Sequence, residues 1–166
     1  MTVLPGKRGP SLRYPGRVYR ADLARDVAAL TRSGVARLIL LVDDDELARW
    51  SDAELVERAA GLGLEIDRHP IPDGLPPASV AEMDEILRSV GETRSVADVA
   101  VACMGGVGRT GTVAACALVA AGWEAGAAIA RVRELRHPMA IETEVQEQFV
   151  QTYWGERGSG SATVAP

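Results

Sequence analysis

A strand–loop–helix pattern at residues 99–121 constrains the fold of this chain more than any other feature. Residues 99–103 form an apolar run that is typical of a strand buried on both faces. A glycine-rich turn follows, and residues 110–121 are apolar again over a length that suits a buried helix. The strand therefore delivers Cys103 to a tight loop, and the loop leads directly into a helix near Arg109.

This loop has the composition of an anion-binding site. Cys103 and Arg109 are separated by five residues, three of which are glycine. Glycines allow successive backbone N–H groups to point inward as an anion nest, and the helix N-terminus adds partial positive charge. Arg109 can offer a planar fork to two oxygens of a tetrahedral anion. Cys103 lies at the base of this cup, where the field favours a thiolate that faces the phosphorus of a bound oxyanion.

Strands and helices alternate along the rest of the chain. Strand candidates lie at residues 17–20, 37–42 and 64–69, and helix candidates lie at 22–34, 43–61, 78–90, 125–136 and 143–153. The alternation predicts an α/β fold, a three-layer sandwich in which a mostly parallel central sheet is covered by helices on both faces. Ligands of such sheets bind beyond the carboxyl ends of the strands, so Cys103 and Asp73 are expected at the same edge.

The length of 166 residues suits one domain. We expect an extended N-terminal arm over residues 1–15, a compact domain over 16–154 and a disordered tail over 155–166. The N-terminal stretch is basic, and it forms either a solvated arm or part of an entrance that attracts acidic substrates. Its bases are Lys7, Arg8, Arg13, Arg17 and Arg20.

Charge and hydropathy exclude several partners. The formal net charge of −5 argues against nucleic acid or an anionic membrane. No apolar run reaches the ~18 residues of a membrane-spanning helix, and residues 1–8 lack the apolar stretch of a signal peptide. Cys116 lies about 10 Å along the predicted helix from Arg109, too far for a disulfide to Cys103, so it is expected to be a buried thiol. Free thiols indicate a reducing cytoplasm.

We expect no metal and no cofactor. His69 and His137 each precede a proline and lack the spacing of metal ligands. The four consecutive acids at residues 43–46 fit a helix N-terminus, where the helix dipole stabilises negative charge, better than they fit a metal site.

Three motifs carry a family resemblance. Residues 103–110 resemble the phosphate-binding signature of the cysteine-dependent protein tyrosine and dual-specificity phosphatase superfamily. Residues 70–76 resemble its general-acid loop, and residues 141–146 resemble the downstream segment of its atypical members, including those similar to kinase-associated phosphatase. The resemblance spans roughly residues 16–150. Ala102 departs from the pattern, because the superfamily usually has His before the nucleophilic cysteine.

The resemblance implies a metal-independent phosphomonoester hydrolase that forms a cysteinyl-phosphate. Cys103 is then the nucleophile, Arg109 binds the phosphoryl oxygens, and Asp73 protonates the leaving oxygen and later activates water, although Asp-Gly after Pro is also ordinary turn chemistry. Thr110 donates to the Cys103 sulfur or caps the helix, and Gln146 orients water or caps its own helix. The loop residues expected to bind phosphate are Met104, Gly105, Gly106, Val107 and Gly108.

The implied substrate is protein phosphotyrosine or phosphothreonine, with a small-molecule phosphate ester as the second option. The loop interior contains no lysine, so weak activity on polyphosphorylated inositides is expected. Ala102 motivates a different class of function, a non-catalytic module that binds phosphoryl groups without turnover. A rhodanese-like sulfurtransferase is a further alternative, but it leaves Thr110 and the Asp73 loop without a role.

Overall fold

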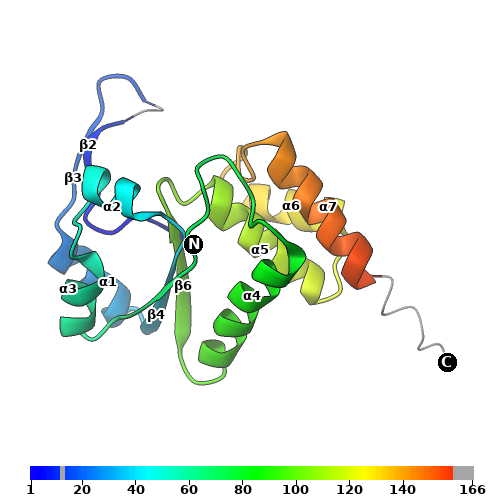
Figure 1. The fold of residues 1–166 in the computed structure, drawn as a ribbon, viewed down its shortest axis with the longest axis horizontal. Helices are drawn as coiled ribbons and strands as arrows, with labels where there is room; N and C mark the ends of the chain where they lie inside the picture. The colour runs from blue at the N-terminus through cyan, green and yellow to red at the C-terminus, as the bar shows by residue number, and fades with distance from the viewer. Residues whose placement is uncertain (12–13, 159–166) are drawn as a thin grey trace.

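A computed structural model describes residues 1–11 and 14–158 of the chain (Figure 1). Six strands and seven helices are formed by these residues. In chain order they are β1 (Thr2–Val3), β2 (Arg8–Pro10), β3 (Val18–Arg20), α1 (Leu23–Arg32), β4 (Val35–Leu40), α2 (Asp44–Trp50), α3 (Leu55–Gly61), β5 (Glu65–Arg68), α4 (Val80–Arg94), β6 (Asp98–Cys103), α5 (Gly108–Ala120), α6 (Ala125–Leu135) and α7 (Glu144–Gly158).

The central sheet has the strand order β1-β6-β4-β5, and each neighbouring pair is parallel. Helices α1 and α3 pack on β4 and β5, whereas α4 and α5 pack on β4 and β6. In Figure 1, α1, α2 and α3 lie to one side of the sheet and α4 to α7 to the other. The predicted α/β sandwich with a mostly parallel sheet is therefore confirmed.

Alternation along the central strands sends side chains to two separate cores. Leu38 and Leu40 of β4 point into the cluster beneath α1, α2 and α3, while Ile39 belongs to the cluster around α5. Strand β6 divides in the same way, with Ala102 in the first cluster and Cys103 in the second. The face to which each residue of β6 points therefore decides whether it can take part in a site near α5.

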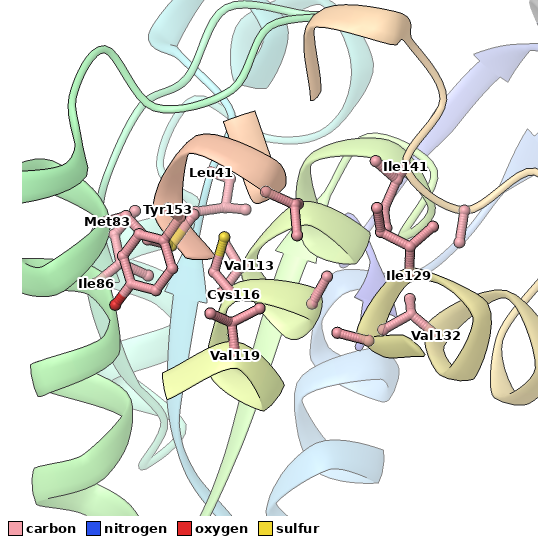
Figure 2. Packing of buried hydrophobic residues seen from close by; sticks show 14 of the residues in the cluster. Leu41, Met83, Ile86, Val113, Cys116, Val119, Ile129, Val132, Ile141 and Tyr153 are labelled. Carbon is pink, nitrogen blue, oxygen red and sulfur yellow. The ribbon is translucent and has the colours of Figure 1, made fainter. Parts of the chain in front are cut away.

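Helix α5 lies in the middle of the second core. Figure 2 shows Cys116 on α5 between Val113 and Val119, with Met83, Ile86 and Tyr153 on one side and with Ile129, Val132 and Ile141 on the other. Cys116 is fully buried, as predicted, and burial raises the pKa of its thiol to about 12. Both cysteines are free thiols.

The N-terminal segment is tied to the domain. Residues 1–11 are largely extended, as expected of an arm, but Thr2 and Val3 pair with Ala102 and Cys103 in the central sheet. Strands β2 and β3 form an antiparallel hairpin. A two-residue strand has no periodic pattern, so nothing local in the sequence marks β1. The basic residue Arg13 lies outside the described residues.

Two other boundaries differ from expectation. The helical region predicted over residues 43–61 is two helices, α2 and α3, with a break at residues 51–54. Helix α7 continues to Gly158, so the first four residues of the expected tail are helical, and residues 159–166 lie outside the described part.

Candidate active site

The loop that joins β6 to α5, residues 103–109, is anchored through its backbone carbonyls. Lys7 Nζ donates to the Met104 carbonyl at 3.1 Å, and Arg136 Nε donates to the Gly106 carbonyl at 2.8 Å. The Val107 carbonyl accepts from the backbone N–H of Gly111 at 3.1 Å and from that of Ile141 at 3.3 Å. These anchors come from the N-terminal segment, from the end of α6 and from the segment before α7.

Anchoring the carbonyls fixes the direction of the amides. In a trans peptide the C=O and the following N–H point in opposite directions, and none of the described peptide bonds is cis. The N–H groups of Gly105, Val107 and Gly108 therefore point away from the anchors. Gly105 and Val107 line the same pocket as Cys103 and Arg109, so these amides are placed to bind an anion there.

Two of the glycines in this loop lie in tight surroundings. Gly106 has a φ of +65°, and a Cβ at this position would lie 2.5 Å from the Thr2 carbonyl oxygen. A Cβ at Gly108 would lie 2.3 Å from Glu142 Oε2. Gly106 is therefore required, because a Cβ there would meet the backbone of β1, whereas a Cβ at Gly108 would meet only the end of the Glu142 side chain, which can move.

Cys103 lies at the base of the loop. Its side chain is 2% exposed, and its Sγ is 3.8 Å from the hydroxyl of Thr110, which is fully buried. At this distance the Cys103 thiol can donate a weak hydrogen bond to that hydroxyl oxygen. Ala102 points to the opposite face of the sheet, among the apolar residues beneath α1. A histidine at position 102 would have to enter that core.

The guanidinium of Arg109 is almost completely buried, with 1% of the side chain exposed. Glu46 binds it through both carboxylate oxygens, at 2.6 Å to Nη1 and 2.7 Å to Nη2. Nη1 also donates to the Ile71 carbonyl at 2.8 Å. Burial alone would lower the pKa of Arg109, but the hydrogen bonds to Glu46 and the charges of Cys103, Glu46 and Asp73 raise it above the usual value. Arg109 is a fixed cation.

Asp73 lies beside this cation, at the tip of a turn. Its Oδ1 accepts from Arg109 Nη2 at 3.0 Å, while 76% of its side chain is exposed. The Leu75 N–H donates to the Pro72 carbonyl at 3.1 Å, and Gly74 has a φ of +76°. These features define a β-turn, which is the structure expected of Asp-Gly after Pro. The carboxylate is both open to solvent and aimed at the Cys103 loop.

The N-terminus of α7 holds the Asp73 turn from the other side. The Thr143 hydroxyl donates to the Gly74 carbonyl at 2.8 Å, and Gln146 Nε2 donates to the Leu75 carbonyl at 3.2 Å. Gln146 Oε1 accepts from the Glu142 N–H at 2.8 Å, and the Gln146 N–H donates to Thr143 Oγ1 at 3.3 Å. The Thr143 hydroxyl thus caps the helix as in a capping box, whereas Gln146 Oε1 accepts from the N–H of Glu142 and not from that of Thr143.

These side chains surround one pocket with a volume of about 180 Å³. Cys103, Arg109 and Asp73 line it together. The structure thus brings together side chains from two separated segments that the sequence singled out, the Cys103 loop and the Asp73 turn. Thr110 and Gln146 are not among the residues that line the pocket. Thr110 contacts the Cys103 sulfur, and Gln146 holds the Asp73 turn through the Leu75 carbonyl.

Residues 14–150 match the family described as PTP-SAK: Swiss Army Knife protein, DSP-PTPase phosphatase domain. This chain belongs to the DSP-PTPase phosphatase family. The predicted membership of the dual-specificity phosphatase superfamily is therefore confirmed.

Relatives of this DSP-PTPase domain occur in distant organisms. Cyclin-dependent kinase inhibitor 3 of Rattus norvegicus is 28% identical over 139 residues, which cover 81% of this chain. The chain spans 64% of the length of that protein. The uncharacterized protein MJECL20 of Methanocaldococcus jannaschii is 34% identical over 122 residues, which cover 71% of this chain and 76% of the relative.

Solved structures agree with this family assignment. Tk-PTP in its active form is 34% identical, with a TM-score of 0.70, and the match covers 81% of this chain and 86% of that one. Kinase associated phosphatase, with its catalytic-site cysteine changed to serine, has a TM-score of 0.82 at 24% identity. That match covers 95% of this chain and 85% of the other, and it shows a shared fold.

Two residues of the DSP-PTPase site make contacts across long stretches of the chain. Glu46 was assigned to the N-terminus of a helix, and it does form a capping box with Asp43 at the start of α2. The same carboxylate also binds Arg109, which lies 63 positions later in the chain. Lys7 was grouped with a basic stretch, yet it is only 9% exposed and touches the Cys103 loop. No local pattern marks either long-range contact.

Other features of this DSP-PTPase chain lie apart from the pocket. His69 Nε2 lies 3.3 Å from Asp67 Oδ2, and His137 Nδ1 accepts from the Met139 N–H at 3.0 Å. In the described residues, no group of three or more His, Cys, Asp or Glu is placed to hold a metal ion. None of the helices formed by those residues has the length and apolarity that a bilayer crossing requires.

Proposed function

We propose that this domain hydrolyses phosphate monoesters through a cysteinyl-phosphate formed on Cys103, without a metal or other cofactor. The observation that supports this most is the shared pocket of Cys103 and Arg109, in which a buried thiol lies below inward-pointing amides and beside a fixed cation. Such surroundings stabilise a trigonal-bipyramidal phosphoryl group in its equatorial plane.

In the first step, the Cys103 sulfur attacks phosphorus and the bond from phosphorus to the ester oxygen breaks. Asp73 gives a proton to the leaving oxygen. In the second step, water attacks the phosphocysteine while Asp73 takes a proton from it. Phosphate leaves, and the Cys103 thiolate re-forms with the Thr110 hydroxyl as a donor at its side.

Phosphate binding and release of Asp73 are coupled in this mechanism. Asp73 accepts from Arg109 Nη2, and Glu46 occupies the other direction of that nitrogen. A phosphoryl oxygen that binds Nη2 therefore takes the place of Asp73 and turns its carboxyl group toward the leaving oxygen. Because Glu46 and the Ile71 carbonyl remain, the guanidinium itself need not move.

Gln146 acts in this scheme through the Asp73 turn. Both ends of its buried amide are engaged, one by the Leu75 carbonyl and the other by the Glu142 N–H. We assign it the role of a positioning residue that, with Thr143, holds the turn near Arg109. To orient the hydrolytic water, its NH₂ group would first have to release Leu75.

Two substrate classes fit this chemistry. The resemblance favours proteins phosphorylated on tyrosine or threonine. The presence of Lys7 within the pocket favours small phosphate esters. A nucleophilic thiol works only when reduced, which supports a reducing, cytoplasmic setting.

The rival functions make different use of the site. A phosphoryl-binding module needs the amides and Arg109 but gives Asp73 no role, and a sulfurtransferase needs neither Thr110 nor Asp73. The hydrolase alone uses a carboxylate that is exposed, tied to Arg109 and aimed at the pocket.

The test of the nucleophile is phosphate release from a panel of phosphopeptides and small phosphate esters. Cys103→Ser should abolish turnover but retain affinity for inorganic phosphate, because the amides and Arg109 remain. Cys116→Ser is the matched control and should retain most of the rate. Turnover that survives in Cys103→Ser excludes the thiolate mechanism, whereas binding without turnover in the natural protein supports the phosphoryl-binding module.

The test of Asp73 uses leaving groups of different quality. Asp73→Asn should lose more rate on an alkyl phosphate than on nitrophenyl phosphate, whose leaving group needs little protonation. Equal losses of rate on the two esters would mean that Asp73 only forms the turn and does not act as the general acid.

A further inference from the structure

Lys7 has a buried and fixed position in the pocket. Only 9% of the residue is exposed, its Nζ donates to the Met104 carbonyl at 3.1 Å, and the ammonium lies 4.2 Å from the centre of the Tyr19 ring. Lysines are rarely buried to this degree, because removing an ammonium from water is costly. Its neighbour Arg8, by contrast, is exposed.

The pocket is divided by charge. Lys7 contacts the strand end of the Cys103 loop, at Met104, the residue directly after the nucleophile. Asp73 and Glu142 lie at the helix end, where Asp73 binds Arg109 and Glu142 lies against Gly108. All three line the same cavity. A ligand whose phosphoryl group occupies the loop therefore meets a cation on one side and carboxylates on the other.

We propose that Lys7 forms a second anion subsite, and that the substrates are small phosphate monoesters with one further anionic group, a carboxylate or a second phosphate. The proposal rests on the hydrolase function given above and narrows its substrate class. A second anion on the Lys7 side gains a charge-assisted contact in a partly desolvated pocket.

The burial of Lys7 and the volume of the pocket limit the size of the substrate. Aromatic walls, formed by Tyr14, Tyr19 and Trp50, stand around a pocket of about 180 Å³. Acidic residues that flank a phosphotyrosine in a peptide remain outside such a pocket and do not reach a lysine that is 9% exposed. The second anion must therefore belong to the same small body as the phosphate. Among the described residues that line the pocket, Lys7 and Arg109 are the cations, and because Arg109 binds the phosphoryl group, Lys7 matches one additional anion rather than the several of a polyphosphate.

The direct test is binding to the Cys103→Ser protein, measured by titration calorimetry. The ligands are ortho, meta and para isomers of carboxyphenyl phosphate, each with its neutral carboxamide counterpart, and the isomers of phenylene bisphosphate as the second-phosphate arm. We expect at least one carboxylate or bisphosphate isomer to bind about tenfold more tightly than its neutral counterpart. This comparison needs no change at Lys7.

The variants then locate the effect. Lys7→Met should remove the tenfold preference, and Lys7→Arg, which keeps the charge, should retain part of it. Arg8→Met removes the same unit of charge from the adjacent, exposed position and should leave the preference intact. A preference that persists in Lys7→Met, or one that is absent from every isomer, overturns the proposal. So does tighter binding of an acidic phosphotyrosine peptide that is insensitive to Lys7→Met.

Turnover by the protein with Cys103 intact separates this proposal from the hydrolase function. Rapid hydrolysis with no preference for a second anion means that the subsite is wrong and the hydrolase stands. A Lys7-dependent preference in binding, without hydrolysis of any ester, means that the hydrolase is wrong and the subsite stands.

Discussion

At the scale of single residues, Arg109 depends on a partner far away in the sequence. Glu46 reaches it from the first turn of α2 and occupies both terminal nitrogens. This pair keeps the guanidinium in one place, and it compensates a charge that the core would otherwise not tolerate. The ion pair with Glu46 therefore orients Arg109 for phosphate binding, and it also stabilises the buried charge of the guanidinium.

We expect Glu46→Gln to lower the free energy of unfolding by about 3 kcal/mol, because it leaves a buried cation without its main counter-charge. Phosphate affinity should fall as well, since the guanidinium loses its fixed orientation. Urea denaturation and phosphate titration measure the two effects. Glu65→Gln is the control: it breaks an ion pair with Arg37 in which the carboxylate side chain is 61% exposed, and it should cost less than about 1 kcal/mol. Similar losses in the two variants would contradict this role of Glu46.

The surroundings of position 102 explain why it holds a small residue, alanine, and not histidine. Its side chain is fully buried on the face of β6 that packs beneath α1, away from the Cys103 sulfur. Ala102→His should therefore destabilise the fold by about 1–3 kcal/mol through overpacking. Ala81→His, at an exposed position of helix α4, should change stability by less than about 0.5 kcal/mol. If Ala102→His proved as stable as the natural protein, the core beneath α1 would have room that the structure does not show.

At the scale of elements, the junction between the Asp73 turn and α7 is the least expected connection. Thr143 and Gln146 begin a helix, and each donates a side-chain hydrogen bond to a carbonyl of the turn. The general-acid candidate is thereby attached to the last helix of the domain.

Thr143→Val removes one of these hydrogen bonds while it nearly preserves volume. The turn should loosen, so the rate on an alkyl phosphate should fall several-fold more than the rate on nitrophenyl phosphate. Thr152→Val serves as the control, because the Thr152 hydroxyl bonds to Gln148 within α7 and is exposed. Steady-state kinetics on the two esters measure these rates. An equal loss of rate in Thr143→Val and Thr152→Val would argue against attachment of the turn through Thr143.

The same elements show what a sequence can predict. The Cys103 loop is contiguous, so its spacing alone indicates an anion site next to a thiol. The helices and the longer strands follow from apolar periodicity. Glu46 and Lys7 act through contacts 63 and 97 positions away in the chain. Such pairings depend on how β1, β6 and α2 come together, which no local pattern encodes.

At the scale of the whole molecule, Cys116 links stability to pH. Burial raises the pKa of its thiol to about 12, whereas a free cysteine titrates near ~8.5. Below ~8.5 the folded and unfolded states both keep the proton. Above it only the unfolded chain loses the proton, so the free energy of unfolding falls by about 1.4 kcal/mol per pH unit.

Cys116→Ala should remove this contribution. Between pH 8 and pH 10 the natural protein should lose about 2 kcal/mol more stability than the variant. The variant retains the weaker loss that comes from Tyr153, whose pKa is also raised by burial. Urea denaturation at the two pH values measures the difference, and parallel losses would show that the Cys116 thiol ionises as readily in the folded state as in the unfolded chain.

The pairing of β1 with β6 has a consequence for synthesis of the protein. Thr2 meets Ala102, and Lys7 meets Met104, so each of these segments, once made, awaits a partner made about a hundred residues later. Closing so long a loop is entropically costly and slow compared with forming the helices between. On the ribosome, β1 and Lys7 thus emerge well before the Cys103 loop that they support. An unfinished chain holds no assembled phosphate pocket, and the nucleophile acquires its surroundings only when these two distant segments have met.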